Sequence, residues 1–244
     1  MFLKLPAELR LRIAEYALEQ RPAAGIPHIG RHLQEYRNDY RPSENLALLL
    51  VCRQFNIDFT SLAYNKTRFT LWTDEHGARM QELPSYKLRS IRKLAYYPNE
   101  YDMESWGNFF HNLEQLRLDE LVLFCSHTWT VGLSTIKIMV LFLRRLQHVK
   151  RIKFVLYGKM GTNRSAYCSL IGAMMKEDHY QRYDAPGAPK VEATWWDWHL
   201  NTHENLITLR AQGPRPVLPE EEYMILMKPK VDALMAEAER VAGL

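Results

Sequence analysis

Few residues in this sequence combine the types and the spacing that catalysis or nucleotide binding requires. Residues 158–165 contain two glycines and a lysine, but not in the Gly-x-x-x-x-Gly-Lys-Ser/Thr order that cradles a phosphate, so we expect a turn. The nucleophile elbow Gly-x-Ser-x-Gly and the zinc motif His-Glu-x-x-His are both absent. We therefore do not expect an enzyme.

The histidines and cysteines suggest no metal or redox centre. His199 and His203 are four residues apart, which would form a metal-binding pair on a helix. The alternating sequence around them instead predicts a strand and then a turn, where two such side chains do not converge. Cys52, Cys125 and Cys168 are odd in number and far apart, which is typical of reduced intracellular thiols. We expect no cofactor, and we interpret Cys52 as a small buried side chain.

Two clusters of basic residues could attract an acidic partner. They comprise Lys87, Arg89, Arg92 and Lys93, and then Arg144, Arg145, Lys150, Arg151 and Lys153. If the segments that carry them stack, the clusters could align in one stripe that attracts acidic protein segments or phosphates. The alternative is a solvated polar face on amphipathic elements. A net charge of +4 is too small for a dedicated nucleic-acid binder, so nucleic acid is not the expected partner.

The basic clusters lie within an apolar pattern, Φ-x-x-Φ-x-x-Φ-x-Φ, that occurs three times. The three sets are Leu88, Ile91, Leu94 and Tyr96; Phe110, Leu113, Leu116 and Leu118; and Leu146, Val149, Ile152 and Phe154. Each set ends with the period of a strand, and helical stretches at 104–112 and 133–147 lie between them. Parallel strands joined by helical crossovers are the simplest construction, although three unrelated strands could share the pattern by chance. A further short strand is predicted at 69–72.

The C-terminal third predicts a tryptophan-rich hairpin and a last helix. After a helix at 166–183 and a break at 184–189, residues 191–200 alternate and residues 206–209 form the return strand. Trp196 and Trp198 share one face and Trp195 lies on the other; we expect them in the core, with a partner surface as the alternative. The last helix begins at Pro219. The residues expected to face inward are Met224, Met227, Val231, Leu234, Met235, Ala238 and Val241.

Two helices at the N-terminus organise the rest of the chain. Pro6 suits a helix start, and Leu5, Leu9, Ile13 and Tyr16 then form one apolar stripe. A polar, proline- and glycine-containing interval at 19–44 predicts a long surface loop. A second helix is predicted at 45–64, and its first two turns are apolar almost all round, so we expect that end to be buried.

These two helices resemble the F-box, the short helical module by which substrate receptors bind the Skp adaptor of cullin–RING ubiquitin ligases. The resemblance is carried by the Leu-Pro-x-Glu-Leu start at residues 5–9 and by Val-Cys-Arg-x-Phe at residues 51–55. The pattern over residues 2–71 is similar to a large group of fungal F-box-like proteins, and Thr-Trp-Trp-Asp-Trp at 194–198 resembles a late stretch of such chains. An F-box joins its first two helices by a short loop, whereas residues 19–44 intervene here.

The resemblance implies a non-catalytic substrate receptor of a Skp–cullin-type ligase. We expect an α/β (α+β) fold: an F-box-like module at 1–66, with its insert at 19–44, packed on a leucine-rich-repeat-like α/β domain at 67–244. The residues expected to face the adaptor are Leu5, Pro6, Leu9, Ile13, Val51 and Phe55. A second surface, for an unknown target, would include Trp195, Arg144, Arg145, Lys150 and Arg151.

Two alternatives to a ligase receptor remain from the sequence. The F-box-like helices could be an internal lid of a structural subunit, or the basic residues could bind nucleic acid or an acidic partner. An exposed apolar stripe on residues 5–18 would favour a module that binds a partner, and a covered stripe would favour a lid.

Composition and hydropathy place the chain among soluble proteins. Hydrophobic residues make up 47% and charged residues 25%, as in ordinary globular domains. The most apolar run, at 136–143, is far shorter than the roughly 20 residues of a membrane helix, and no signal peptide is recognisable. We expect a location in the cytosol or the nucleus.

Overall fold

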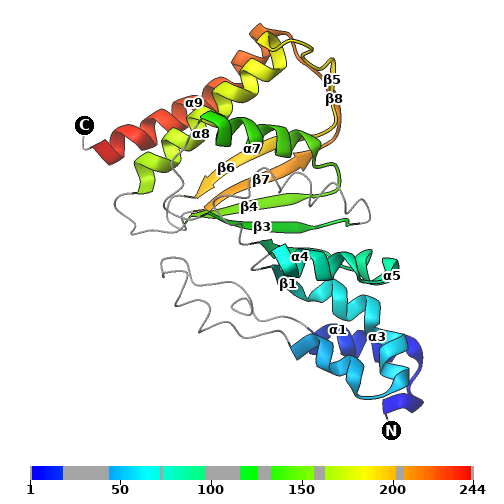
Figure 1. Cartoon of the computed structure of the whole chain (residues 1–244). Coiled ribbons are helices and arrows are strands. Elements are labelled where there is room, and N and C mark those ends of the chain that lie inside the picture. The colour runs from blue at the N-terminus through cyan, green and yellow to red at the C-terminus, as the bar shows by residue number, and fades with distance from the viewer. Residues whose placement is uncertain are drawn as a thin grey trace.

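The computed structural model describes residues 2–18, 44–71, 74–96, 116–125, 133–156, 163–201 and 206–242. The N-terminal part is helical, with a 3-10 turn η1 (Phe2–Lys4), helix α1 (Ala7–Ala17), a 3-10 helix η2 (Glu44–Leu50) and helix α3 (Arg53–Lys66). Figure 1 shows these elements grouped at one end of the molecule, below a sheet. The predicted surface loop lies almost entirely outside the described residues, as does the helix predicted at 104–112.

A six-stranded mixed sheet forms the centre of the protein and defines an α/β class. Its order is β1-β2-β3-β4-β7-β6. The strands are β1 (Arg68–Leu71), β2 (Lys93–Tyr96), β3 (Glu120–Cys125), β4 (Arg151–Leu156), β6 (Trp195–Asn201) and β7 (Leu206–Gln212). The first four strands are parallel neighbours in chain order, and the β6–β7 hairpin joins antiparallel to β4. The predicted parallel strands and the predicted hairpin are therefore confirmed.

The second apolar set is placed differently from its prediction. Leu118 forms an isolated bridge with Val149, the second position of the third set, and the strand begins after it at Glu120. Leu121 then pairs with both Leu94 and Ile152, which are the third positions of their sets. The prediction that this strand ends at Leu118 was therefore wrong. The residue that lies beside Leu94 and Ile152 in the core is Leu121, three residues further along the chain.

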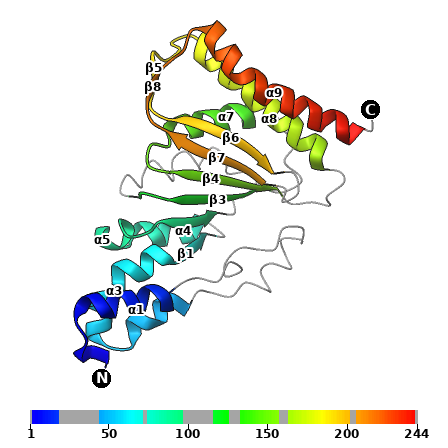
Figure 2. The ribbon, with the colours of Figure 1, turned by 180° about the vertical axis from the view of Figure 1, so that it is seen from behind.

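Helices cover the sheet and extend beyond it. They are α4 (Asp74–Gln81), α5 (Ser85–Leu88), α7 (Leu133–Arg145), α8 (Asn163–His179) with a π-helical end η3 (Tyr180–Asp184), and α9 (Glu220–Ala242). A two-stranded ribbon of β5 (Val191–Glu192) and β8 (Arg215–Pro216) connects to them. The views in Figures 1 and 2 both place α8 and α9 side by side, at the end of the molecule opposite α1 and α3.

One hydrophobic core runs through the described protein. It includes Ala14 and Phe59 of the N-terminal helices, Leu94 and Ile152 of the sheet, and Leu234 of α9. The predicted inward face of α7 is confirmed, since Ile136, Val140 and Leu143 are all buried. The boundary drawn between residues 66 and 67 falls between α3 and β1, and buried side chains are continuous across it.

Two predictions about helix faces were wrong in part. The helix expected at 45–64 is interrupted at Cys52, whose extended backbone begins α3, so Leu50 and Val51 turn outward and are exposed. On α9, the predicted Leu234 is buried and so is Tyr223, which was not predicted, whereas the predicted Met224, Val231 and Met235 are exposed. The orientation of α9 follows Tyr223, whose ring packs against Trp195.

Candidate interaction surfaces

Helix α1 has apolar residues on two faces, and the one predicted to bind a partner is exposed. Leu9, Ile13 and Tyr16 lie at i, i+4 and i+7, which places them on one side of the helix. Their exposed fractions are 50%, 47% and 75%. On the other side, Ala14 and Leu18 are buried, at 2% and 3%. The exposed residues Leu9, Ile13 and Tyr16 are called the α1 face below.

Polar contacts fix the direction of the α1 face. Arg10 forms an ion pair of 2.8 Å with Asp58 on α3 and donates a hydrogen bond to the carbonyl of Leu3. At the other end of α1, Asn45 Nδ2 donates to the carbonyl of Leu18 at 3.1 Å. Arg10 thus attaches α1 to α3 and η1, and Leu18 attaches its end to η2, and these contacts together set which side of the helix is exposed.

The six residues predicted to contact an adaptor do not all share this exposure. Pro6, Leu9, Ile13 and Val51 are exposed, and Leu5 is half-buried. Phe55 faces inward instead, and its ring lies 5.2 Å from that of Phe59 and 5.3 Å from that of Phe2. Phe55 is half-buried and helps to hold α3 and the N-terminal turn together, and its contact with a partner stays a prediction.

The predicted second surface is not a single surface. Trp195 is buried, and the guanidinium of Arg182 lies 4.2 Å from its ring centroid. Arg144 turns into the same cluster, where it pairs with Asp178 and Glu192. Both residues are therefore unavailable to a partner, because they join α7, α8 and the sheet. The side chain of Arg145 lies outside the described residues.

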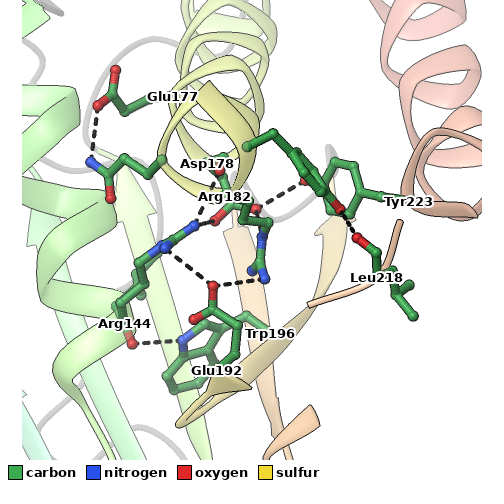
Figure 3. Close-up of polar contacts among 11 residues, drawn as sticks. Arg144, Glu177, Asp178, Arg182, Glu192, Trp196, Leu218 and Tyr223 are labelled. Atoms are coloured by element: carbon green, nitrogen blue, oxygen red, sulfur yellow. Dashed lines mark hydrogen bonds and ion pairs between the residues drawn. The ribbon is translucent and has the colours of Figure 1, made fainter. Parts of the chain in front are cut away.

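Figure 3 shows the polar contacts of this cluster, which link Arg144, Asp178, Arg182, Glu192 and Tyr223. Arg182 binds Asp178 at 2.8 Å and Glu192 at 3.0 Å, and Arg144 binds Glu192 at 3.1 Å. Tyr223 donates its hydroxyl hydrogen to Asp178 at 2.9 Å. Burial raises the pKa of Tyr223, and the charge of Asp178 adds to this, so the phenol stays protonated. We interpret the cluster as structural, since its charges are paired with one another.

The polar face of the sheet carries a row of charged residues. The register places Arg68, Lys93, Glu120, Arg151, Arg210 and Asp197 side by side across β1, β2, β3, β4, β7 and β6. In-register neighbours point to the same side of a sheet. The opposite side carries Leu94, Leu121 and Ile152, which are fully buried. We call these six residues the charged row.

Glu120 is the acidic centre of the charged row. It lies 2.9 Å from Arg68, 2.8 Å from Lys153 and 3.9 Å from Arg151. Burial acts to raise the pKa of Glu120, but the hydrogen bonds and positive charges of Lys153 and Arg68 outweigh it and hold the pKa below its usual value. The carboxylate is therefore ionised at neutral pH and neutralises part of the row.

Among the described residues, Arg151 and Arg210 of the charged row form no ion pair as short as those of Arg68 and Lys153 with Glu120. Arg151 lies directly opposite Arg210 in the antiparallel pair, and both are exposed. Asp197, beside Arg210, is engaged by Lys230 of α9. Lys150, the other predicted basic residue here, pairs with the exposed Asp119 at 2.7 Å. The predicted alignment of basic residues thus exists for Lys93 and Arg151, with Arg68 and Arg210 added by the fold.

No family model, curated protein or solved structure matches this chain. The geometry of its own residues is therefore the basis for a functional proposal. Within the described ranges, no group of three or more histidine, cysteine, aspartate or glutamate residues could hold a metal ion. His199 is an exposed strand residue, and His203 lies outside those ranges. None of the described helices is both long and apolar enough to cross a membrane.

Sequence reasoning missed Arg68, Glu120 and Arg210 as site residues. Arg68 and Arg210 stand outside the two basic clusters, and Glu120 is a single acid in an apolar strand. The signal that could have found them is the alternation within each strand, which places them on the side opposite the leucines. To see that these residues lie side by side also requires the register between the strands. The predicted position of the second apolar set gave the wrong register for β3.

Proposed function

We propose that this chain is a non-catalytic adaptor whose N-terminal helices form an F-box-like module. In this proposal, the module binds a Skp-type adaptor of a ubiquitin ligase, and the α/β domain holds a target protein. The sequence pattern at residues 5–9 and 51–55 supports the choice of partner. The proposed place of action is the cytosol or the nucleus.

The observation that carries the proposal is the exposure of the α1 face. Leu9 and Ile13 are each about half exposed, although a helix that served as an internal lid would have its apolar stripe covered. Completing the burial of one such side chain contributes on the order of 1 kcal/mol to association. Val51, at 64% exposure, offers a further apolar contact from the η2–α3 connection.

The sheet supports the second half of the proposal. Its first four strands are parallel and adjacent in chain order, which is the arrangement that a stacked leucine-rich-repeat-like unit requires. Leu94 and Ile152 of the first and third sets fill one row of the core together with Leu121, and the polar side of the same strands carries the charged row. A repeat-like sheet of this kind would offer its polar side to a target.

A pull-down with purified Skp adaptor tests the proposal. The wild-type chain should retain the adaptor, and the double variant Leu9→Asp plus Ile13→Asp should lose it, because two charges would then lie in the apolar contact. The matched control is Ile225→Asp, which changes an equally apolar residue that is 74% exposed on α9, far from α1. Circular dichroism should show the same helical signal in all variants.

Two results would overturn this assignment. The first is a folded wild-type chain that retains no adaptor. The second is a double variant that retains as much adaptor as Ile225→Asp. Either result would favour the alternative of a structural subunit, whose N-terminal helices serve only to pack against the rest of the chain.

A further inference from the structure

We infer that three cations of the charged row bind an acidic, extended segment of a partner protein. The site consists of Lys93 on β2, Arg151 on β4 and Arg210 on β7, on the polar side of the sheet. This inference rests on the proposed function in one respect only, which is that the bound segment would belong to the target protein. The contact chemistry is carboxylate to guanidinium and ammonium.

The first argument is a repulsion within the sheet that the described acids offset only in part. Arg151 and Arg210 lie directly opposite each other, and like charges at such a position destabilise a sheet. The two neighbouring carboxylates offset only part of this repulsion: Glu120 lies 3.9 Å from Arg151, and the charge of Arg210, after the hydrogen bond from Lys230, helps to lower the pKa of Asp197. Glu120 is held more closely by Arg68 and Lys153 than by Arg151, and Asp197 is held by Lys230. A bound anion would supply the missing charge.

The second argument is accessibility. The side chain of Arg151 is 47% exposed, and Arg210 is also exposed. Lys93 is half-buried and forms no ion pair among the described residues. By contrast, Val122 and Val155, on the same side of the sheet but further along their strands, are buried. The accessible part of this side is therefore centred on Arg151 and Arg210, with half-buried Lys93 two strands from Arg151, and Glu120 between them is buried.

The spacing of the cations fits a peptide. Neighbouring strands are about 4.8 Å apart, so Lys93 and Arg210, three strands apart in the sheet order, are separated by roughly 14 Å. Alternate side chains of an extended peptide are about 6.8 Å apart. Acidic residues at positions i and i+4 of one segment would therefore reach both ends of the site, and the one at i+2 would lie near its middle.

The charge of the row favours a protein segment over a nucleic acid. A nucleic-acid site neutralises many phosphates along a backbone, whereas this row has three accessible cations and contains Glu120 and Asp197. Asp119, exposed next to Glu120, adds a further negative charge. A short peptide can place its few carboxylates beside the cations and neutral side chains beside these acids. A nucleic-acid backbone carries a phosphate at every position, so some phosphates would lie beside the acids.

Fluorescence anisotropy with the purified full chain tests the inference. The probe is a fluorescein-labelled deca-glutamate peptide at low salt, with a deca-serine peptide as the neutral probe and labelled oligo(dT) as the nucleic-acid probe. We expect binding of deca-glutamate that weakens as salt rises, no binding of deca-serine, and weaker binding of oligo(dT). These measurements need no variant and no Skp adaptor.

The variant arm uses Arg151→Gln plus Arg210→Gln. Its affinity for deca-glutamate should fall roughly tenfold, since each exposed charge contributes modestly. Its melting temperature should not fall, because the repulsion between the two arginines is removed. Arg210→Lys keeps the charge and should bind almost as the wild type does. Lys137→Gln, an exposed cation on α7, and the Leu9→Asp plus Ile13→Asp variant should bind unchanged.

The inference is overturned if deca-glutamate does not bind at low salt, or if the double glutamine variant binds it as tightly as Lys137→Gln does. Tighter binding of oligo(dT) than of deca-glutamate would assign the surface to nucleic acid instead and also overturn it. Loss of adaptor binding in the pull-down, with peptide binding intact, would contradict the proposed ligase role but leave this site standing.

Discussion

Arg182 lies over the indole ring of Trp195, with 4.2 Å between the guanidinium carbon and the ring centroid. The same guanidinium pairs with Asp178 on its own helical segment and with Glu192 before the hairpin. One side chain therefore connects the end of α8 to the first strand of the hairpin. Its position explains why Trp195, expected as either core or surface, is core.

Arg182→Met should destabilise the protein strongly. The change removes a buried cation from Asp178 and Glu192 and leaves Arg144 as their remaining described cation, so we expect a loss of about 3–5 kcal/mol in the free energy of unfolding. Urea denaturation followed by circular dichroism measures it. Arg240→Met is the control, because its pair with Glu237 lies at the exposed end of α9. A loss no larger than that of the control would contradict the structural role of the cluster.

Trp196→Phe should cost more stability than Trp195→Phe. Trp196 Nε1 donates a hydrogen bond to the carbonyl of Leu143 at 2.8 Å, so its loss leaves a buried acceptor unpaired, which costs about 1–3 kcal/mol. Trp195 Nε1 is buried and has no acceptor among the described residues, so phenylalanine gives up no hydrogen bond there. Thermal denaturation of both variants gives the comparison. The reverse order would show that stacking under Arg182 outweighs the hydrogen bond.

Leu18→Ala and Leu9→Ala should separate the two sides of α1. Leu18 is 3% exposed, so its truncation should cost about 2–5 kcal/mol through lost burial and a cavity. Leu9 is 50% exposed, and its truncation should change stability by about 0.5 kcal/mol or less. Guanidinium denaturation tests the pair. A similar cost at both positions would mean that the α1 face is covered.

The sequence was sufficient for the strands at β1, β2 and β4, for the parallel arrangement and for the hairpin, because the apolar periodicity of each strand is local. It was insufficient for the alignment of Leu118 and for the orientation of α9. Leu116 and Leu118 have the spacing of the last two positions of the repeat, and so do Leu121 and Leu123. Only the pairing with the neighbouring strands shows which of these two pairs lies in the strand. On α9, apolar residues occur on several sides, so contacts of Tyr223 decide which side is buried.

The candidate surfaces likewise divide into those that depend on one element and those that depend on contacts between elements. The stripe of Leu9 and Ile13 could be predicted because one helix defines it. The charged row could not, because it needs the register of six strands, and the position of Arg144 depends on acids that come more than thirty residues later in the chain. A basic residue in a cluster can face either a partner or a buried carboxylate, and sequence spacing alone does not separate these outcomes.

Glu120→Gln should destabilise the protein in a pH-dependent way. The pKa of Glu120 is lower in the folded chain than its ordinary value of 4.5, since Lys153 and Arg68 outweigh the effect of burial. A carboxylate with a lowered folded pKa stabilises the fold above its unfolded pKa, and this contribution is lost as the pH falls through the folded value. We expect Glu120→Gln to lose about 1–3 kcal/mol at pH 7, because two partly buried cations lose their partner.

The difference between wild type and Glu120→Gln should therefore be constant near neutral pH and should shrink once the pH falls below about 4.5. Urea denaturation from pH 7 to pH 3 measures it. Asp119→Asn is the matched control, since it removes the neighbouring acid, whose pair with Lys150 is largely exposed, and it should change stability little at any of these pH values. A difference that stays constant or grows on acidification would show that Glu120 is not held ionised by Lys153 and Arg68, and the assignment of Arg151 and Arg210 as the partly neutralised cations would lose its basis.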